Sequence, residues 1–166
     1  ETLIKSAADL ISEDFPNYQY VAGRLINYHL RKEVYKSYNP CSLHDLVKKN
    51  VAKGFYDPDI LAAYSEAEWT EIDSYIQHER DEKFAYVAME QWRGKYLVQN
   101  RVTGEIFETP QMAYALIAAT LFQNYDKSTR LHWVKKYYDQ VSLGNISLPT
   151  PVMAGVRTPQ RQFSSC

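Results

Sequence analysis

The sequence predicts a mainly α-helical domain that contains one β-hairpin. Apolar residues recur every three or four positions through most of residues 2–142, which is the pattern of helices with one buried face. The period changes from about 3.6 to 2 only near residues 96–108. With 166 residues, of which 45% are hydrophobic, the chain is long enough to bury a core without disulfide bonds or metal.

Two helices are expected first. The apolar positions from Thr2 to Ile11 form one stripe, and Phe15-Pro16-Asn17 ends it because proline cannot continue a helix. Asn17 is then a candidate N-cap for a longer helix that runs to about Tyr38, where Asn39-Pro40 closes it.

Three short helical segments follow, each with a start signal. Ser42 is a candidate N-cap for a helix that ends at Gly54. Asp57-Pro58 begins a turn or short helix, and Ser65-Glu66-Ala67-Glu68 has the spacing of a capping box. These starts are rich in acidic residues, which the helix dipole favours.

The central part is expected to contain a helix and the hairpin. Residues 80–92 have helical periodicity, and Gly94 is expected to stop this helix. Residues 96–98 and 106–108 then flank a turn in which Thr103-Gly104 supplies a residue able to adopt positive φ.

The last third begins with two helices. Thr109-Pro110 opens a strongly apolar one through Phe122, and a second through Val141 should form a helical hairpin with it. Residues 146–151 are expected to be extended because each proline biases its predecessor away from helix. The polar stretch 157–166 shows no helical period, so we do not expect it to be buried.

Composition excludes several functions. A formal net charge of −1 gives no general attraction to nucleic acid or anionic membranes, and no apolar run approaches the length of a membrane span. Two cysteines are too few for a disulfide scaffold, which is typical of a reducing, cytoplasmic location. The four histidines lack the spacing of a zinc site, and no glycine-rich phosphate loop is present, so we expect no metal site.

Two groups of basic residues can each be interpreted in two ways. His29 and Lys32 share a helix face and, with Arg31, could meet an anionic ligand, or they could form a solvated basic stripe. Arg157 and Arg161 present the same choice.

The cysteines also differ. Cys166 follows two small hydroxyl residues and could be an exposed redox thiol, although a lone cysteine is more often buried and inert. Cys41, beside a proline and before a helix, fits the inert interpretation better.

Five segments of the sequence resemble those of a known enzyme family. Residues 94–106 (GKYLVQNRVTGEI), 146–159 (ISLPTPVMAGVRTP) and 161–166 (RQFSSC), together with 18–22 (YQYVA) and 29–32 (HLRK), resemble the large, catalytic subunit of aerobic class I ribonucleoside-diphosphate reductases. The resemblance covers the whole chain, as an N-terminal portion of that subunit.

The resemblance implies a helical N-terminal region, residues 1–142, leading into the first strand or strands of a ten-stranded α/β barrel at residues 143–166. The rest of the barrel is absent from this sequence. In that family a cysteine thiyl radical reduces a ribonucleoside diphosphate. By resemblance, Thr150 contacts the substrate phosphate, Ser165 helps to hold the substrate, and Cys166 is one of two redox thiols, the partner thiol being outside this chain. Paired thiols can supply two electrons by closing to a disulfide.

The same resemblance implies that Lys32, and with weaker support His29, contact the allosteric effector ATP or dATP in the complete subunit. It also implies three protein partners: the remaining C-terminal part of the large subunit, a small subunit with a di-metal/radical cofactor, and a thioredoxin- or glutaredoxin-type reductant. The chain alone is expected to bind no cofactor and to be inactive. The alternative is a noncatalytic helical interaction or regulatory module, because 14 tyrosines and three tryptophans exceed what a small core usually needs.

Overall fold

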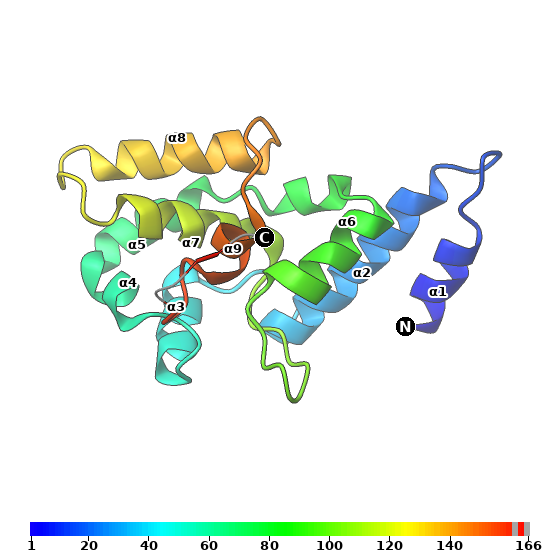
Figure 1. Cartoon of the computed structure of the whole chain (residues 1–166), viewed down its shortest axis with the longest axis horizontal. Helices are drawn as coiled ribbons and strands as arrows, with labels where there is room; N and C mark the ends of the chain where they lie inside the picture. Colours follow the sequence, from blue (N-terminus) through cyan, green and yellow to red (C-terminus); the bar gives the residue numbers. More distant parts are fainter. Residues whose placement is uncertain (161–162, 165–166) are drawn as a thin grey trace.

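The computed structural model describes residues 1–160 and 163–164, and it is mainly helical (Figure 1). No helix in this part of the chain is both long and apolar enough to cross a bilayer. In chain order the helices are α1 (Thr2–Asp9), α2 (Tyr18–Tyr35), α3 (Leu43–Ala52), α4 (Pro58–Ala63), α5 (Glu66–Tyr75), the 3-10 helix η1 (His78–Lys83), α6 (Tyr86–Gln91), the π-helix η2 (Trp92–Tyr96), α7 (Pro110–Phe122), α8 (Arg130–Ser142) and α9 (Thr150–Gly155).

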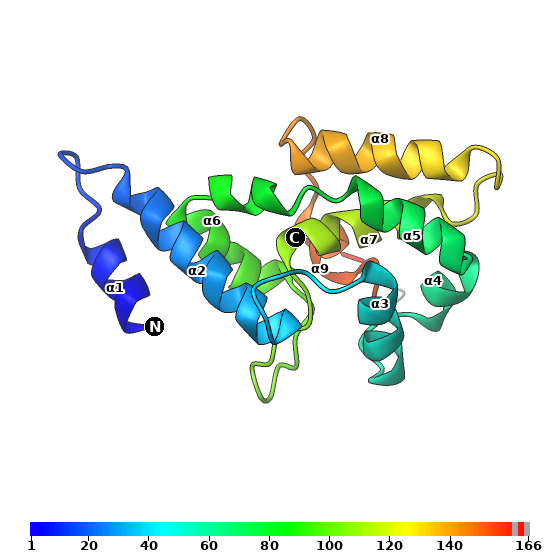
Figure 2. The same cartoon turned by 180° about the vertical axis from the view of Figure 1, so that it is seen from behind.

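The helices form two groups that meet at the middle of the molecule. Helices α1, α2 and α6 lie together at one end, while α3, α4, α5, α7 and α8 form the other (Figures 1 and 2). The expected helical hairpin is confirmed, since α7 and α8 lie side by side. The short helix α9 packs against α7 and η2, between the two groups.

Helix α7 is at the centre of the core. It is apolar around most of its circumference, and Met112, Leu116 and Ile117 are completely buried. A helix that is hydrophobic on all sides is stable only when other elements surround it. The sequence pattern of this segment therefore determines its central position.

The predicted start signals are confirmed at three helices. Ser65 accepts a hydrogen bond from the backbone N–H of Glu68, whose carboxylate accepts one in return from the N–H of Ser65, so the capping box is complete. The Ser42 hydroxyl caps α3, and the Asp57 carboxylate caps α4 by accepting from the N–H of Asp59. Local sequence is sufficient here because the partners are three residues apart or fewer.

The single helix predicted for residues 80–92 is wrong. The chain forms η1, an extended break at Phe84 and Ala85, and then α6 and η2, which continues past Gly94. The break coincides with a close crossing of α2: a Cβ atom at Gly23 would lie 2.2 Å from the carbonyl oxygen of Phe84. A tertiary contact thus interrupts a segment with helical periodicity.

The predicted hairpin forms a turn but not β-strands. Gly104 has the expected positive φ, and one antiparallel bridge joins Gln99 to Ile106, but none of the described residues lies in a strand. The ladder does not extend past Val98, because side chains take the next pair of backbone groups. The N–H of Val98 donates to the Glu108 carboxylate (2.7 Å), and the carbonyl oxygen of Phe107 accepts from the Asn50 side chain (3.1 Å).

The barrel strand expected within residues 143–166 is also not found in the described part of that segment. Residues 147–149 are irregular, and the chain then enters helix α9 at Thr150. Pro149 has extended backbone angles as predicted, but Pro151 lies in the first turn of α9, where a missing N–H removes no helical hydrogen bond. The prolines therefore mark a helix start rather than a strand.

Candidate functional site

A buried ion pair fixes the C-terminal segment to the helical body. The Arg157 and Glu108 side chains are both 0% exposed. The Arg157 Nε donates to both carboxylate oxygens, at 3.1 and 2.8 Å, and Nη2 also pairs with Glu108. The remaining donors reach the carbonyl oxygens of Met153 (2.7 Å) and Tyr96 (3.0 Å). The guanidinium thus joins the segment before helix α7 to η2 and α9.

The Glu108 carboxylate has two further donors. The Tyr56 hydroxyl donates to it at 2.5 Å, and the backbone N–H of Val98 donates at 2.7 Å. Burial alone would lower the pKa of the Arg157 guanidinium, but the charge and hydrogen bonds of Glu108, together with Tyr56, outweigh burial and raise the pKa above its ordinary value. Burial, together with the adjacent Glu108, raises the pKa of the Tyr56 hydroxyl well above its ordinary value. The group is therefore a charged pair with a neutral phenol, and it acts as an anchor.

This anchor corrects the interpretation of Arg157. Neither an anionic ligand site nor a solvated stripe describes it, because it is completely buried and its donors have protein partners. The expectation that the segment from residue 157 onward is not buried is wrong at this position. Sequence reasoning missed Glu108 and Tyr56 because they lie 49 and about 100 residues from Arg157 in the chain, and no local pattern links them.

The predicted substrate residues have different outcomes. Thr150 is exposed and is the first residue of α9. Ser165 and Cys166 lie outside the described residues, so their predicted roles stay predictions. Phe163 returns to α9, since its ring would be 2.7 Å from a Cβ atom at Gly155. The anchor, Thr150 and Phe163 thus all belong to one region around α9.

The predicted effector residues lie on α2. His29 and Lys32 are exposed on this helix, with His29 Nδ1 3.9 Å from the carboxylate of Glu33 and the Lys32 ammonium 4.5 Å from the centre of the Tyr28 ring. Arg31 does not share their exposure. It is 5% exposed, and its Nη2 donates to the carbonyl oxygen of His78 at 2.8 Å.

A second buried polar cluster lies where η1 meets α7. Gln111 donates to Asp81 at 2.8 Å, and Tyr138 donates to the Gln111 carbonyl at 2.7 Å. Burial raises the pKa of Asp81 to about 7. Burial, aided by the charge of Arg31, lowers the pKa of His78 to about 4. These residues contribute to the connection between α2, η1, α7 and α8.

The described residues contain no group of three or more histidine, cysteine or acidic side chains that could hold a metal ion. Cys41 is half-buried, and burial raises the pKa of its thiol. A thiol with a raised pKa is a poor nucleophile at neutral pH, in agreement with the inert interpretation.

Comparisons with known proteins give the same relationship over the whole chain. Residues 82–161 match the family described as "Ribonucleotide reductase, all-alpha domain". Over its full length of 166 residues, the chain is 57% identical to the ribonucleoside-diphosphate reductase 1 subunit alpha of Escherichia coli K12. It is also 57% identical to the subunit alpha of Haemophilus influenzae, and 164 of its residues are 49% identical to that of Enterobacteria phage T4.

The chain spans 22% of the length of these relatives. It belongs to the family of class I ribonucleotide reductase large subunits, and it corresponds to an N-terminal portion of them. The predicted resemblance is thereby confirmed, and the mainly helical fold agrees with the all-alpha domain.

Proposed function

We propose that the chain is part of a ribonucleotide reductase catalytic subunit and that it contributes to the reduction of ribonucleoside diphosphates to deoxyribonucleoside diphosphates. The observation that carries this proposal is 57% identity over all 166 residues to the alpha subunit of Escherichia coli. The match includes the region around α9, where the predicted substrate residue Thr150 lies.

The reaction needs two electrons and two protons for each sugar. Two thiols supply them when they close to a disulfide, and the 2′-hydroxyl of the ribose leaves as water. In this proposal Cys166 is one of the two thiols, and the second thiol and the radical cysteine belong to the rest of the subunit. Ser165 helps to hold the substrate.

Thr150 supplies a hydroxyl that can donate to a phosphate oxygen of the substrate. Its exposure leaves the hydroxyl free to meet a ligand, whereas the buried anchor keeps the segment that carries it in place. The Arg157 guanidinium supports this role by holding the carbonyl oxygen of Met153, three residues after Thr150. Arg157 is therefore a positioning residue.

The chain also contributes to the effector site of the complete subunit. The exposed Lys32 ammonium suits a phosphate of ATP or dATP, because a charged donor forms strong hydrogen bonds with phosphate oxygens. His29 fits less well, since Glu33 places a carboxylate 3.9 Å from its ring. A triphosphate needs further cationic groups, which we assign to other parts of the subunit.

The partners in this proposal are the remaining C-terminal part of the large subunit, the small subunit with its di-metal/radical cofactor, and a thioredoxin- or glutaredoxin-type reductant. The small subunit generates the radical, so the described chain needs no metal of its own for this step.

Reconstitution tests the proposal. The chain is mixed with the remaining large-subunit polypeptide and the small subunit, and conversion of CDP to dCDP is measured with a dithiol. We expect turnover that requires all three polypeptides. Cys166→Ser should abolish multiple turnover, while Cys41→Ser, at the half-buried thiol, is the matched control and should retain it.

Two further variants test the binding roles in the same assembly. Thr150→Val should raise the KM for CDP, because it removes a hydroxyl and preserves the shape of the side chain. Lys32→Ala should weaken dATP binding, whereas Lys48→Ala, at an exposed lysine on α3, should not. Full multiple turnover by Cys166→Ser would refute the redox assignment.

A further inference from the structure

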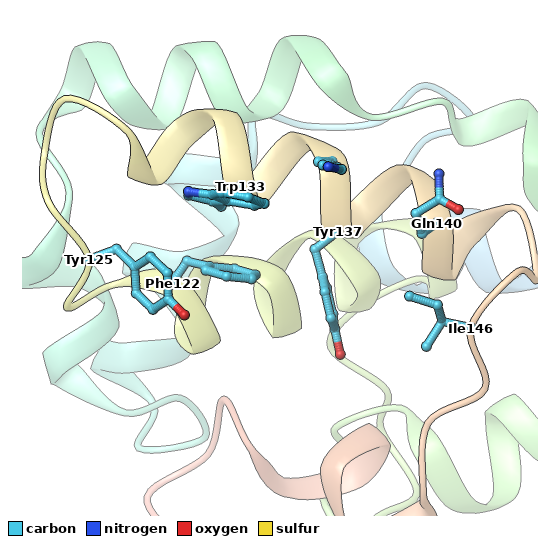
Figure 3. A pocket seen from close by; sticks show the side chains of 7 residues that line it. Phe122, Tyr125, Trp133, Tyr137, Gln140 and Ile146 are labelled. Carbon is cyan, nitrogen blue, oxygen red and sulfur yellow. The ribbon is translucent and has the colours of Figure 1, made fainter.

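An aromatic groove runs along α8 on the side that faces the end of α7. Its volume is about 310 Å³, and its lining residues are Phe122, Tyr125, Trp133, Lys136, Tyr137, Gln140 and Ile146. Trp133, Tyr137 and Gln140 are on α8, Phe122 ends α7, and Ile146 follows α8 (Figure 3). We call this feature the α8 groove.

The rings in the α8 groove are ordered against one another. Phe122 stacks on Trp133, with ring centres 6.5 Å apart and planes at 18°, and it contacts Tyr125 and Tyr137 edge-on at 4.8 and 5.5 Å. The surface is therefore preorganised, because these side chains would lose little freedom on binding.

Much of this aromatic surface is open. Trp133 is 38%, Tyr125 is 51% and Ile146 is 40% exposed, although other tryptophans of the chain are almost completely buried (Trp69 0%, Trp92 3%). Soluble domains rarely expose a continuous apolar surface without a binding partner, and aromatic residues dominate the energetic centres of interfaces.

The charge at the groove restricts the partner. None of the seven lining residues is acidic, and the Lys136 ammonium lies 5.2 Å from the centre of the Trp133 ring. Within the described part of the chain, no carboxylate forms an ion pair with Lys136, whereas its neighbour Lys135 pairs with Asp139 at 3.7 Å. A partner segment with apolar side chains and a carboxylate would match this surface.

We infer that the α8 groove is an internal interface, occupied by a carboxylate-bearing apolar segment of the rest of the large subunit. This rests on the proposed function. The chain covers 22% of the length of its relatives, so a complete subunit supplies a large additional polypeptide that can cover the groove. A surface that belongs to an intramolecular interface is expected to be apolar and exposed when only this portion is present.

Fluorine NMR tests this inference directly. The chain is labelled with 5-fluorotryptophan, which gives three signals, and the Trp133→Phe variant assigns the signal of the exposed ring. The unlabelled remainder of the large subunit is then added. We expect the Trp133 signal to lose its H₂O/D₂O solvent shift, while the signals of Trp69 and Trp92 show no such shift before or after addition.

Charge reversal at the rim provides the second measurement. Lys136→Glu should raise the Kd for the remainder of the subunit by about fivefold or more, because it places a carboxylate against the partner carboxylate. Lys135→Glu is the matched control on the same helix, outside the groove, and should change the Kd less than about twofold. Both side chains are exposed, so neither change is expected to unfold the chain.

The outcomes separate this inference from the proposed function. If the complex forms and reduces CDP while Trp133 keeps its solvent shift, the interface is refuted and the proposed function stands. If protection of Trp133 increases with the concentration of the chain alone, a second copy occupies the groove and the inference is wrong. If no complex forms, both the inference and the proposed function are overturned.

Discussion

The Arg157–Glu108 anchor makes a quantitative prediction about stability. Arg157→Met preserves much of the side-chain length but removes every guanidinium donor. Glu108 would then keep only the Tyr56 hydroxyl and the Val98 N–H as partners, at a site with no exposed surface. Removing one member of a buried ion pair is destabilising by about 3–5 kcal/mol, because the other charge stays buried without compensation.

That loss is large against the total stability of a natural domain, which is about 5–15 kcal/mol. Urea unfolding followed by far-UV circular dichroism measures it as a shift of the midpoint at nearly constant m-value. Arg101→Met is the matched control: Arg101 is exposed and donates to the carbonyl oxygen of Gly94 at 3.0 Å, so its loss should be below about 0.5 kcal/mol.

A double variant isolates the electrostatic part. Adding Glu108→Gln to Arg157→Met removes the unpaired charge, so the combined loss should be about 2 kcal/mol smaller than the sum of the two single losses. A loss below about 1 kcal/mol for Arg157→Met, together with additive behaviour of the pair, would refute the anchor as a stabilising element.

Two further predictions concern packing and pH. Gly23→Ala should lower the free energy of unfolding, measured by urea titration, by about 1–3 kcal/mol, because the added Cβ would lie 2.2 Å from a backbone oxygen. Gly94→Ala is the control: a Cβ at Gly94 meets open space, so the loss should not exceed about 0.5 kcal/mol. Burial raises the pKa of Asp81 to about 7. The folded chain therefore keeps a proton that the unfolded chain releases above the ordinary pKa of about 4, so the contribution of Asp81 to the free energy of unfolding falls as pH rises. Burial lowers the pKa of His78 to about 4. Up to about pH 6.5 the unfolded chain binds a proton at this residue that the folded chain does not bind, so the contribution of His78 to the free energy of unfolding rises with pH. Between about pH 4.5 and 6.5 the two oppose each other: stability should rise with pH in Asp81→Asn and fall in His78→Gln, and an unchanged pH profile in both variants would contradict the assignment.

Sequence reasoning succeeded where the determining contacts are local. The capping box at Ser65 and Glu68 and the left-handed turn at Gly104 are set by residues within a few positions of each other, so their residue types predict them. The apolar segment of α7 is predicted equally well, because burial on all sides follows from its composition.

It failed where distant groups compete for the backbone. The hairpin ladder ends because Glu108 accepts from the N–H of Val98 and Asn50 donates to the carbonyl oxygen of Phe107, and no local pattern indicates those partners. The helix predicted at residues 80–92 is interrupted where the backbone of Phe84 lies close to Gly23 of α2. In both cases local propensity is overridden by a contact between segments far apart in the chain.

For the candidate site too, the sequence indicated some features and the tertiary structure decided others. Similarity along the chain indicated the family, which depends on the order of amino acids alone, and the roles that it implies for Thr150, Lys32 and His29 stay predictions. The tertiary structure decided that Arg157 is a buried anchor rather than a surface cation, because its environment is built by Glu108, Tyr56 and backbone carbonyls from separate elements. Helix periodicity and caps are properties of neighbouring residues, whereas the burial and pairing of a charge depend on which distant segments fold against it.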